Sequence, residues 1–309
     1  MDTNLPFISV VVPVYNEQEE IEELLDSLMV LDWPQEQYEI ICCDNGSTDR
    51  SREIMSSYPI LVLEESKPGP YPARNRAIKQ AKGEFIALTD ADCIVSQQWL
   101  RDLYSGFTSD AVGAVAGSFT PKRLSNHIDY FMFRVLKSPN HNRGSKKVAS
   151  FTVTGNVMYR KEVFDNLGLF DEDTFSGSDV DMSWRLLDSG KYTQTFLEGE
   201  KGLVYHNYHT DFRSFFNVLE RDAYGWFFLT LRYPHLAPIP SVWKYSLKFI
   251  LGFLVLPWIA LGRLLLFFRA EEKSLFQELM WLVVLWQYFI GTLRAKRVHQ
   301  GLLSPSLLR

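Results

Sequence analysis

Between residues 8 and 89 the chain alternates short apolar runs with amphipathic or polar segments, and this alternation limits its fold more than any other feature. The four apolar runs that predict strands are Ile8–Val14, Tyr38–Cys43, Ile60–Leu63 and Glu84–Thr89. The three segments between them that predict helices are Glu17–Leu31, Asp49–Ser57 and Pro72–Ala81. Strands that alternate with helices are typical of βαβ units. The sequence therefore predicts an α/β fold with a mostly parallel sheet flanked by helices.

The composition excludes several classes of protein. With 309 residues, 46% hydrophobic and 22% charged, the chain has ample material for a core and is not disordered. A formal net charge of −5 disfavours a dedicated nucleic-acid-binding protein, which is usually basic, so we expect no nucleic-acid partner. Three cysteines without metal-type spacing indicate a reducing compartment and no disulfide framework. The first apolar run contains Pro13 and is not preceded by a basic region, so we expect no signal peptide.

Acidic and turn-forming residues follow three of the predicted strands. The segments are Pro13-Val14-Tyr15-Asn16-Glu17, then Asp44-Asn45-Gly46-Ser47-Thr48-Asp49, then Asp90-Ala91-Asp92. Ligands of parallel α/β sheets bind beyond the carboxyl ends of the strands, so these segments are the first candidates for a site. The sequence contains neither a G-x-G-x-x-G after the first strand nor a G-x-x-x-x-G-K-[ST], which disfavours dinucleotide dehydrogenases and P-loop enzymes.

Asp90 and Asp92 stand two positions apart at a strand end, so in extended chain both carboxylates point to one side. Such a pair suits a hard cation, Mg²⁺ or Mn²⁺, that keeps part of its coordination shell for phosphate oxygens. The alternative is a solvated turn with two acids. Asp49 is interpreted as a helix-capping residue.

Six segments, in order along the chain, resemble motifs of the family 2 glycosyltransferases with a GT-A fold. They are VVVPVYNEQEEIEELLDSL, DNGSTDRS, ARN, TDADC, GNVMYRKEVFDNLGLFDE and GSDVDMSWRL, and the resemblance covers roughly residues 7–230. It implies a nucleotide-diphosphate sugar donor (a UDP- or GDP-sugar) and a divalent metal, Mg²⁺ or Mn²⁺. It also implies donor-binding residues, namely Pro13, Tyr15 and Glu17 in the nucleoside pocket, Asp44 at the base, Arg74 near the nucleotide and Asp90 at the ribose, with Asp92 on the metal.

The resemblance implies that Asp179 is the catalytic base that removes the proton of the acceptor hydroxyl. Ser178 stands where the family commonly has glutamate, so the match is imperfect here. Asp179 and Asp181 do not share a helical face, so at most one is the base. The alternative is that Ser178 and Asp179 cap a helix. Asp181 and Arg185 are interpreted as structural residues.

Two histidines, His206 and His209, follow the strand-like segment Gly202–Tyr205 without forming an H-E-x-x-H zinc motif. Related enzymes place a histidine near the metal or diphosphate, and by this resemblance we assign His206 to the metal. A buried, hydrogen-bonded histidine is the alternative for each.

The composition changes near residues 234–240, and the chain beyond is strongly apolar. We expect a GT-A domain over residues 1–235, a membrane-associated apolar helical hairpin over residues 241–295 and a tail over residues 296–309. The uncharged runs Phe249–Gly262 and Leu279–Leu293 are shorter than the roughly 18 apolar residues that predict a spanning helix. Basic residues flank the hairpin on both sides, which places it on the cytoplasmic side of the membrane. Three arrangements of this segment are consistent with the sequence: two spanning helices, an in-plane hairpin, or a helical pair packed on the rest of the chain.

Together these features predict an inverting glycosyltransferase that adds one sugar to a hydroxyl of a glycan or lipid-linked acceptor. One alternative is a nucleotidyltransferase, which would need a Gly-rich phosphate loop after the first strand. The other is a non-catalytic membrane-bound protein that binds sugar nucleotides or serves as a scaffold.

Overall fold

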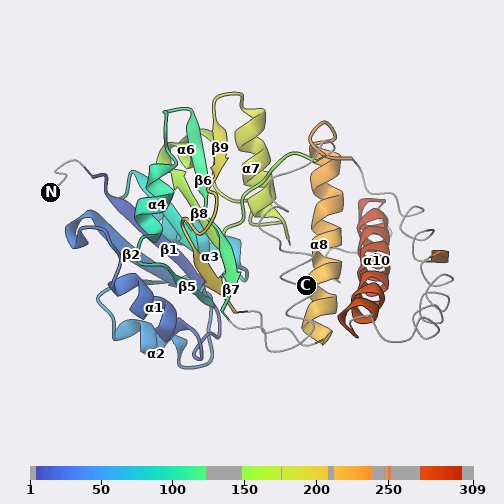
Figure 1. The fold of residues 1–309 in the computed structure, drawn as a ribbon, viewed down its shortest axis with the longest axis horizontal. Helices are drawn as coiled ribbons and strands as arrows, with labels where there is room; N and C mark the ends of the chain where they lie inside the picture. The colour runs from blue at the N-terminus through green and yellow to red at the C-terminus, as the bar shows by residue number, and fades with distance from the viewer. Residues whose placement is uncertain are drawn as a thin grey trace. The chain divides into compact units, whose positions relative to one another are not determined.

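The computed structural model describes residues 5–122, 148–174, 176–207, 212–238, 247, 250–251 and 272–300. These residues fall into two units, which are treated separately (Figure 1). The first unit contains residues 5–122, 148–173 and 178–207. The second contains residues 174, 176–177, 212–238, 247, 250–251 and 272–300, so that the helix following residue 211 belongs to it.

A seven-stranded sheet, ordered β3-β2-β1-β4-β8-β6-β9, forms the centre of the first unit. Its strands are β1 (Ile8–Val14), β2 (Tyr38–Asp44), β3 (Leu61–Glu64), β4 (Phe85–Thr89), β6 (Val112–Ala116), β8 (Asn156–Arg160) and β9 (Thr193–Phe196). β1 runs parallel to both β2 and β4, β2 runs parallel to β3, and β6 runs parallel to β9. Only β8 is antiparallel to its neighbours β4 and β6. The predicted α/β fold with a mostly parallel sheet is confirmed.

The strand order reverses at β1, since the chain moves outward to β2 and β3 and then returns to place β4 on the other side of β1. Such a reversal separates the loops that leave the carboxyl ends of β1 and β4, and it is where open α/β sheets bind ligands.

A second sheet of three short strands, ordered β5-β10-β7, begins directly after the turn that follows β4. Its strands are β5 (Cys93–Val95), β7 (Phe119–Pro121) and β10 (Val204–His206). β10 runs antiparallel to β5, with His206 opposite Cys93, and parallel to β7, with His206 opposite Pro121. This register brings the end of β10 next to the acidic turn after β4.

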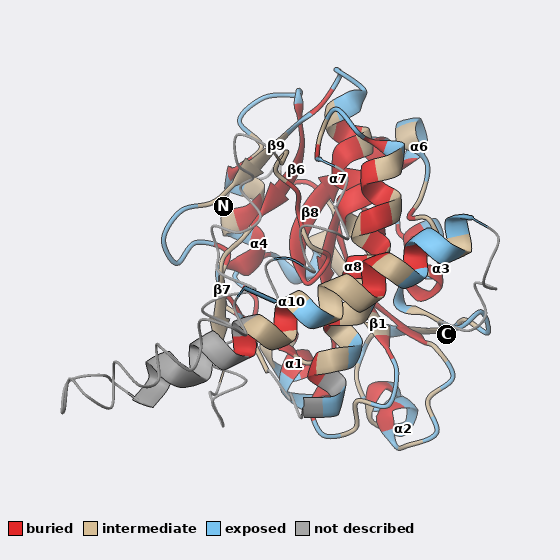
Figure 2. Ribbon diagram, turned by 90° about the vertical axis from the view of Figure 1, so that its right-hand side faces the viewer, coloured by how far each residue is buried: buried red, intermediate tan, exposed pale blue. Residues whose placement is uncertain are grey.

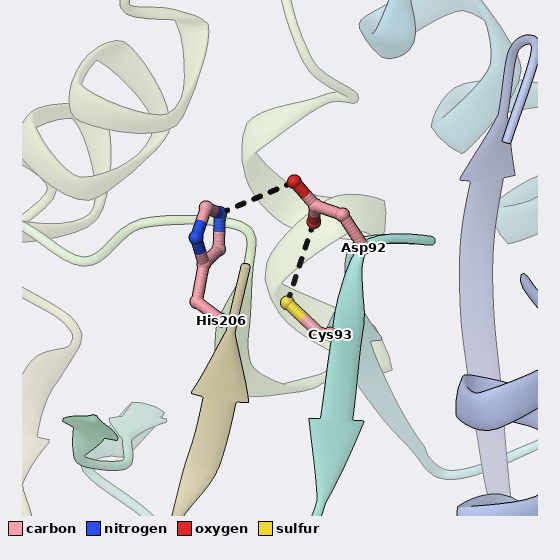
Figure 3. A group of neighbouring side chains, drawn as sticks. All are labelled: Asp92, Cys93 and His206. Carbon is pink, nitrogen blue, oxygen red and sulfur yellow. Dashed lines mark hydrogen bonds and ion pairs between the residues drawn. The ribbon is translucent and has the colours of Figure 1, made fainter. Parts of the chain in front are cut away.

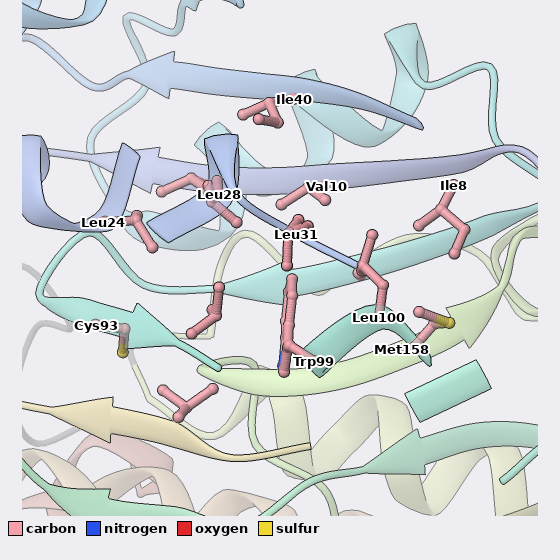
Figure 4. Packing of buried hydrophobic residues seen from close by; sticks show 14 of the residues in the cluster. Ile8, Val10, Leu24, Leu28, Leu31, Ile40, Cys93, Trp99, Leu100 and Met158 are labelled. Carbon is pink, nitrogen blue, oxygen red and sulfur yellow. The ribbon is translucent and has the colours of Figure 1, made fainter. Parts of the chain in front are cut away.

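Helices cover both faces of the large sheet, so that it lies between two apolar clusters. On one face pack α1 (Ile21–Met29), α2 (Ser51–Ser56) and α4 (Trp99–Ser105); on the other pack α3 (Pro70–Gln80), α6 (Lys161–Leu167) and α7 (Ser178–Asp188). Alternate residues of β1 supply the two clusters, Val10 and Val12 to the first and Val11 to the second, as a pleated strand requires. Figure 4 shows Val10, Leu28, Leu31 and Trp99 among the side chains of the first cluster. Figure 2 shows buried residues along β6, β8 and α7.

The first helix is shorter than predicted, because it begins at Ile21 and not at Glu17. Residues before it form a turn whose backbone N–H groups are bound by side chains from the segment after β2. The N–H of Glu17 donates to Oγ of Ser51 at 2.7 Å, and the N–H of Gln18 donates to Oδ2 of Asp49 at 3.0 Å. These bonds fix the chain in a non-helical path.

The second unit contains α8 (Phe212–Arg232) and α10 (Glu272–His299). Arg294 of α10 forms an ion pair with Glu220 of α8. A Cβ atom at Gly291 would lie 2.6 Å from the carbonyl oxygen of Glu220, so the two helices pack closely there. Among the described residues, no helix has the length and apolar character needed to cross a membrane. Apart from Ile250 and Leu251, the predicted run Phe249–Gly262 lies outside the described residues.

Candidate active site

Two loops at the carboxyl ends of β1 and β2 are joined by side-chain hydrogen bonds. The N–H of Asn16 donates to Oγ of Ser47 at 3.0 Å, and the N–H of Thr48 donates to Oδ1 of Asn16 at 2.8 Å. Asn16 has a φ of 55°, in the left-handed region that asparagine tolerates better than most residues. The loops therefore hold each other in one conformation at the point where a ligand of this fold binds.

The predicted nucleoside residues lie in and beside these two loops. Pro13 is paired with Cys43 inside the sheet, whereas the side chain of Tyr15 is 59% exposed. The backbone carbonyl oxygen of Glu17 accepts the N–H of Ile21, so Glu17 lies in the turn that leads into α1. Asp44 ends β2, is buried, and accepts the N–H of Ser47 at 3.2 Å. The four residues gather at one edge of the sheet, with Tyr15 the most accessible.

Asp49 accepts hydrogen bonds from the backbone of Ser51 and Gln18 and from the Ser51 hydroxyl. Burial acts to raise the pKa of Asp49, but these hydrogen bonds outweigh it and lower the pKa below its usual value. Asp49 thus serves to fix the loop.

Arg74 and Asp90 form an ion pair between α3 and the end of β4. Arg74 is buried, and its Nε makes no hydrogen bond to any residue that the structure describes. Its guanidinium carbon lies 5.7 Å from the ring centroid of Tyr71. On the other side of Asp90, a Cβ atom at Gly155 would lie 2.9 Å from Oδ2. The carboxylate of Asp90 is therefore confined between an arginine and a position that only glycine fits without a shift.

Asp92, Cys93 and His206 form a cluster whose possible metal-ligand atoms all lie within 4.8 Å of one another (Figure 3). Nε2 of His206 lies 3.4 Å from Oδ2 of Asp92, and Sγ of Cys93 lies 3.6 Å from Oδ1. The two residues predicted for the metal are thus brought together from β10 and from the turn before β5. The other candidate histidine, His209, lies outside the described residues.

The carboxylate and imidazole of this cluster fit a divalent cation. Together they offer one hard oxygen donor and one nitrogen donor, a set that suits Mn²⁺ and leaves positions for phosphate oxygens and water. Cys93 fits less well, because sulfur is a soft donor whereas Mg²⁺ and Mn²⁺ are hard ions that prefer oxygen ligands. Burial, followed by the charges of Asp92 and Asp90, raises the pKa of the Cys93 thiol well above its usual value. Of the three residues, Asp92 and His206 therefore fit a hard cation better than Cys93 does.

The predicted base, Asp179, lies in the first turn of α7, where its Oδ1 accepts the N–H of Val180 at 2.9 Å. The hydroxyl of Tyr71 donates to the same oxygen at 3.4 Å. Since Tyr71 also lies against Arg74, one residue of α3 connects the predicted base with the predicted donor-binding pair. The neighbouring Ser178 is buried, and its Oγ has no hydrogen-bond partner among the described residues.

Asp181 and Arg185 have the structural role expected of them. Nε of Arg185 donates to Oδ2 of the buried Asp181 at 2.8 Å, and its other nitrogens donate to the carbonyl oxygens of Leu167, Gly168 and Leu169. This arrangement ties α7 to the end of α6.

Sequence reasoning missed Tyr71 and Asn75. Asn75 is buried, donates to the carbonyl oxygen of Phe170 and to Glu172, and accepts the N–H of Phe170 at 3.0 Å, so it fixes the loop that precedes α7. The hydrogen bond from Asn75, together with Lys67, lowers the pKa of Glu172. Tyr71 lies one residue before the predicted helix Pro72–Ala81, but the observed α3 begins at Pro70 and therefore places Tyr71 three positions before Arg74 on the same face.

The chain resembles known proteins in sequence. Residues 9–168 match the family described as Glycosyl transferase family 2. The chain is 33% identical over 207 residues to glycosyltransferase AglE of Haloferax volcanii, covering 63% of this chain and 66% of that protein. It is 43% identical over 131 residues to the poly(ribitol-phosphate) beta-glucosyltransferase of Bacillus spizizenii, covering 38% of this chain and 21% of that protein. Each match spans less than two thirds of the relative's length.

Solved structures show the same fold at low sequence identity. The mannosyltransferase PcManGT from Pyrobaculum calidifontis, in complex with GDP-Man and Mn²⁺, superposes with a TM-score of 0.67 at 20% identity, covering 95% of this chain and 88% of that one. Residues 1–349 of Staphylococcus aureus TarS, in complex with UDP-GlcNAc, give a TM-score of 0.51 at 20% identity, covering 96% and 92%. These two structures support a GT-A-like fold for this chain.

Proposed function

Because the chain belongs to glycosyl transferase family 2, we propose that it transfers one sugar from a nucleotide-diphosphate donor to a hydroxyl group of a glycan or lipid-linked acceptor, with inversion at the anomeric carbon. The observation that carries this proposal is the approach of Asp92 to His206, beside the Arg74–Asp90 pair and with Asp179 linked to that pair through Tyr71. With these proposed roles, the donor-binding residues, the metal ligands and the general base form one site.

The donor nucleotide is proposed to lie against the loops after β1 and β2. Tyr15 offers an exposed ring for stacking on the base, and the buried carboxylate of Asp44 can accept a hydrogen bond from a base N–H group. Asp90, confined by Arg74 and Gly155, can accept hydrogen bonds from ribose hydroxyls. Pro13, in β1, and Glu17, in the turn before α1, contribute to the same pocket through their backbone.

Asp92 and His206 are proposed to hold Mn²⁺ or Mg²⁺. Such an ion, when bound, offsets the negative charge that grows on a departing diphosphate. The buried guanidinium of Arg74 supplies a fixed positive charge beside Asp90 and can orient the nucleotide.

Asp179 is proposed to act as general base. Its carboxylate takes the proton of the acceptor hydroxyl as that oxygen forms a bond to the anomeric carbon. The bond between the anomeric carbon and the diphosphate oxygen breaks on the opposite face, and its electron pair leaves with the diphosphate. The hydroxyl of Tyr71 orients the Asp179 carboxylate for this transfer.

A panel of UDP- and GDP-sugars, incubated with candidate glycan and lipid-linked acceptors with and without Mn²⁺, tests the proposal. We expect nucleotide diphosphate and a glycosylated product in stoichiometric amounts from one donor. Release of pyrophosphate from a sugar phosphate and a nucleoside triphosphate would favour the nucleotidyltransferase alternative. Donor binding without turnover for any acceptor would favour a non-catalytic scaffold.

We also propose membrane association through residues 241–295, on the cytoplasmic side. Among the described residues of this stretch, Leu247, Ile250, Leu251 and Trp286 are exposed apolar side chains, and Lys296 and Arg297 lie in the last turn of α10. Co-sedimentation with phosphatidylglycerol vesicles tests it. We expect Ile250→Asp/Leu251→Asp to weaken sedimentation, whereas Leu61→Asp, at an exposed apolar residue of β3, leaves it unchanged. Equal sedimentation of all three proteins contradicts the proposal.

A further inference from the structure

The residue before α1, Glu20, is a buried carboxylate whose two oxygens contact residues at the ends of β10 and β7. Oε1 accepts a hydrogen bond from Nδ2 of Asn207 at 2.8 Å, and Oε2 lies 3.4 Å from the ammonium of Lys122. Only 9% of Glu20 is exposed. A carboxylate removed from water is costly unless it is paired, so the fold tolerates Glu20 because these partners are in place.

Helix capping does not account for Glu20. It occupies the N-cap position of α1, where a side chain commonly accepts a hydrogen bond from the first turn, but its side chain makes no capping bond. Both oxygens are directed instead to Asn207 and Lys122.

The two partners of Glu20 are bound through their backbones to the two proposed metal ligands. The N–H of Asn207 donates to the carbonyl oxygen of Asp92 at 3.1 Å, and the N–H of Lys122 donates to the carbonyl oxygen of His206 at 3.0 Å. Asn207 is also the residue that follows His206 in the chain. The Glu20 side chain thus joins two short connections, one to each proposed ligand.

The small sheet, which contains His206 and begins one residue after Asp92, has strands too short to fix these two residues alone. β5, β7 and β10 each contain three residues. Three-residue strands have few ladder hydrogen bonds, and their ends open readily unless another contact holds them. His206 is the last residue of β10, where this opening would matter most for the distance between its ring and Asp92.

We infer that Glu20 is a positioning residue that holds His206 and Asp92 at the separation a divalent cation requires, by anchoring Asn207 and Lys122. The inference rests on the proposed function only in taking Asp92 and His206 as the ligands. Residues that orient metal ligands from outside the coordination shell commonly change metal affinity by about 10- to 100-fold when replaced.

Glu20→Ala tests the inference, with Glu23→Gln as matched control. Glu23 pairs with the same ammonium of Lys122, but its side chain is half exposed. Without donor present, we expect the Kd for Mn²⁺, measured by electron paramagnetic resonance, to rise at least about tenfold in Glu20→Ala and to stay within about twofold in the control. Glu20→Gln, which keeps an acceptor for Asn207, should recover part of the affinity.

A second readout needs neither metal nor activity. Cys93 is buried and pairs with His206 in the small sheet, whereas Cys42 and Cys43 are buried in β2. In the metal-free protein, Glu20→Ala should speed alkylation of Cys93, followed by peptide mass spectrometry, at least fivefold while the other two thiols keep their rates. Equal acceleration of all three thiols would indicate general destabilisation and overturn the inference.

The two readouts separate this inference from the proposed function. If the wild-type protein binds no Mn²⁺, the proposed metal site is wrong, and selective labelling of Cys93 decides whether Glu20 holds the segment. If Glu20→Ala does not fold, the comparison uses Glu20→Gln and Asn207→Ala. Unchanged Mn²⁺ affinity and unchanged Cys93 labelling in folded variants overturn the inference.

Discussion

The buried guanidinium of Arg74 is ion-paired with the carboxylate of Asp90 at the point where β4 ends. Gly155 lies on the other side of the same carboxylate. An aspartate held on two sides presents its oxygens in one orientation, and this arrangement gives the proposed donor site its rigidity.

Gly155→Ala should weaken donor binding with little effect on the fold. The new Cβ atom would lie 2.9 Å from Oδ2 of Asp90 and 3.3 Å from the Phe119 ring, so the carboxylate must shift while the backbone need not. We expect the donor Kd to rise roughly tenfold, about 1.4 kcal/mol. Calorimetric titration with the donor, alongside a thermal melt, checks this. An unchanged Kd would show that the position of Asp90 does not matter for the donor.

Asp179→Asn should retain donor binding and lose transfer, because the amide keeps the shape of the side chain but cannot take a proton. We expect kcat to fall by about 10² to 10⁴, the usual contribution of a general base. Asp188→Asn, at the exposed far end of α7, is the control and should transfer at the wild-type rate. If Asp179→Asn transfers normally, the assignment of the base is wrong.

Asn156→Ala should destabilise the first unit strongly. Asn156 is fully buried, accepts from Nε1 of Trp99 at 2.9 Å and donates to the carbonyl oxygens of Ser118 and Gly202. Removing it takes this partner from two buried groups, Nε1 of Trp99 and the carbonyl oxygen of Gly202, whereas the Ser118 carbonyl keeps the N–H of Val204. The expected loss is about 3 kcal/mol in unfolding free energy. The exposed Asn166, with one bond to Tyr192, is the control, and Asn166→Ala should cost about 1 kcal/mol or less. Equal urea midpoints for the two variants would contradict the prediction.

Tyr159 should make stability depend on pH at the alkaline end. Burial, above all, raises the pKa of Tyr159 to about 12. An unfolded tyrosine loses its proton near pH 10, so between pH 10 and 12 the unfolded state is the one that ionises. The contribution of Tyr159 to stability is therefore complete below pH 10 and is lost as the pH rises toward 12, by on the order of 2 to 3 kcal/mol.

Urea unfolding at several pH values, compared between the wild type and Tyr159→Phe, isolates this contribution. The variant loses the hydrogen bond to Thr152 at every pH, but its stability should fall less steeply between pH 10 and 12. Parallel curves for the two proteins would show that Tyr159 does not titrate as its burial requires.

Much of the large sheet could be predicted from local sequence. The runs at Ile8–Val14 and Phe85–Thr89 are apolar except for Ser9 and Thr89, as expected for strands buried on both faces. The start of α1 could not be predicted, because its first turn is displaced by hydrogen bonds from Ser51 and Asp49, which lie far along the chain. The strands β5 and β7 were not foreseen either, since three residues carry no readable period.

The proposed metal ligands show a second reason why the sequence predicts only part of the site. Asp92 was predicted from its spacing to Asp90 and from the family resemblance, whereas His206 was assigned to the metal by the resemblance alone. Only the antiparallel pairing of β10 with β5 shows why the two residues meet. Glu20 carried no sequence signal, because a glutamate before an amphipathic helix is ordinarily solvent-exposed. Its role depends on long-range contacts with Asn207 and Lys122.

The most direct test of the account is calorimetric titration of the active nucleotide sugar into wild-type protein and Asp92→Asn, each with Mn²⁺ and with chelator. We predict that Mn²⁺ strengthens donor binding by the wild type at least about tenfold and that this gain disappears in Asp92→Asn. Donor binding by the wild type that is equally tight in chelator, or a full Mn²⁺ gain in Asp92→Asn, would contradict the proposed site.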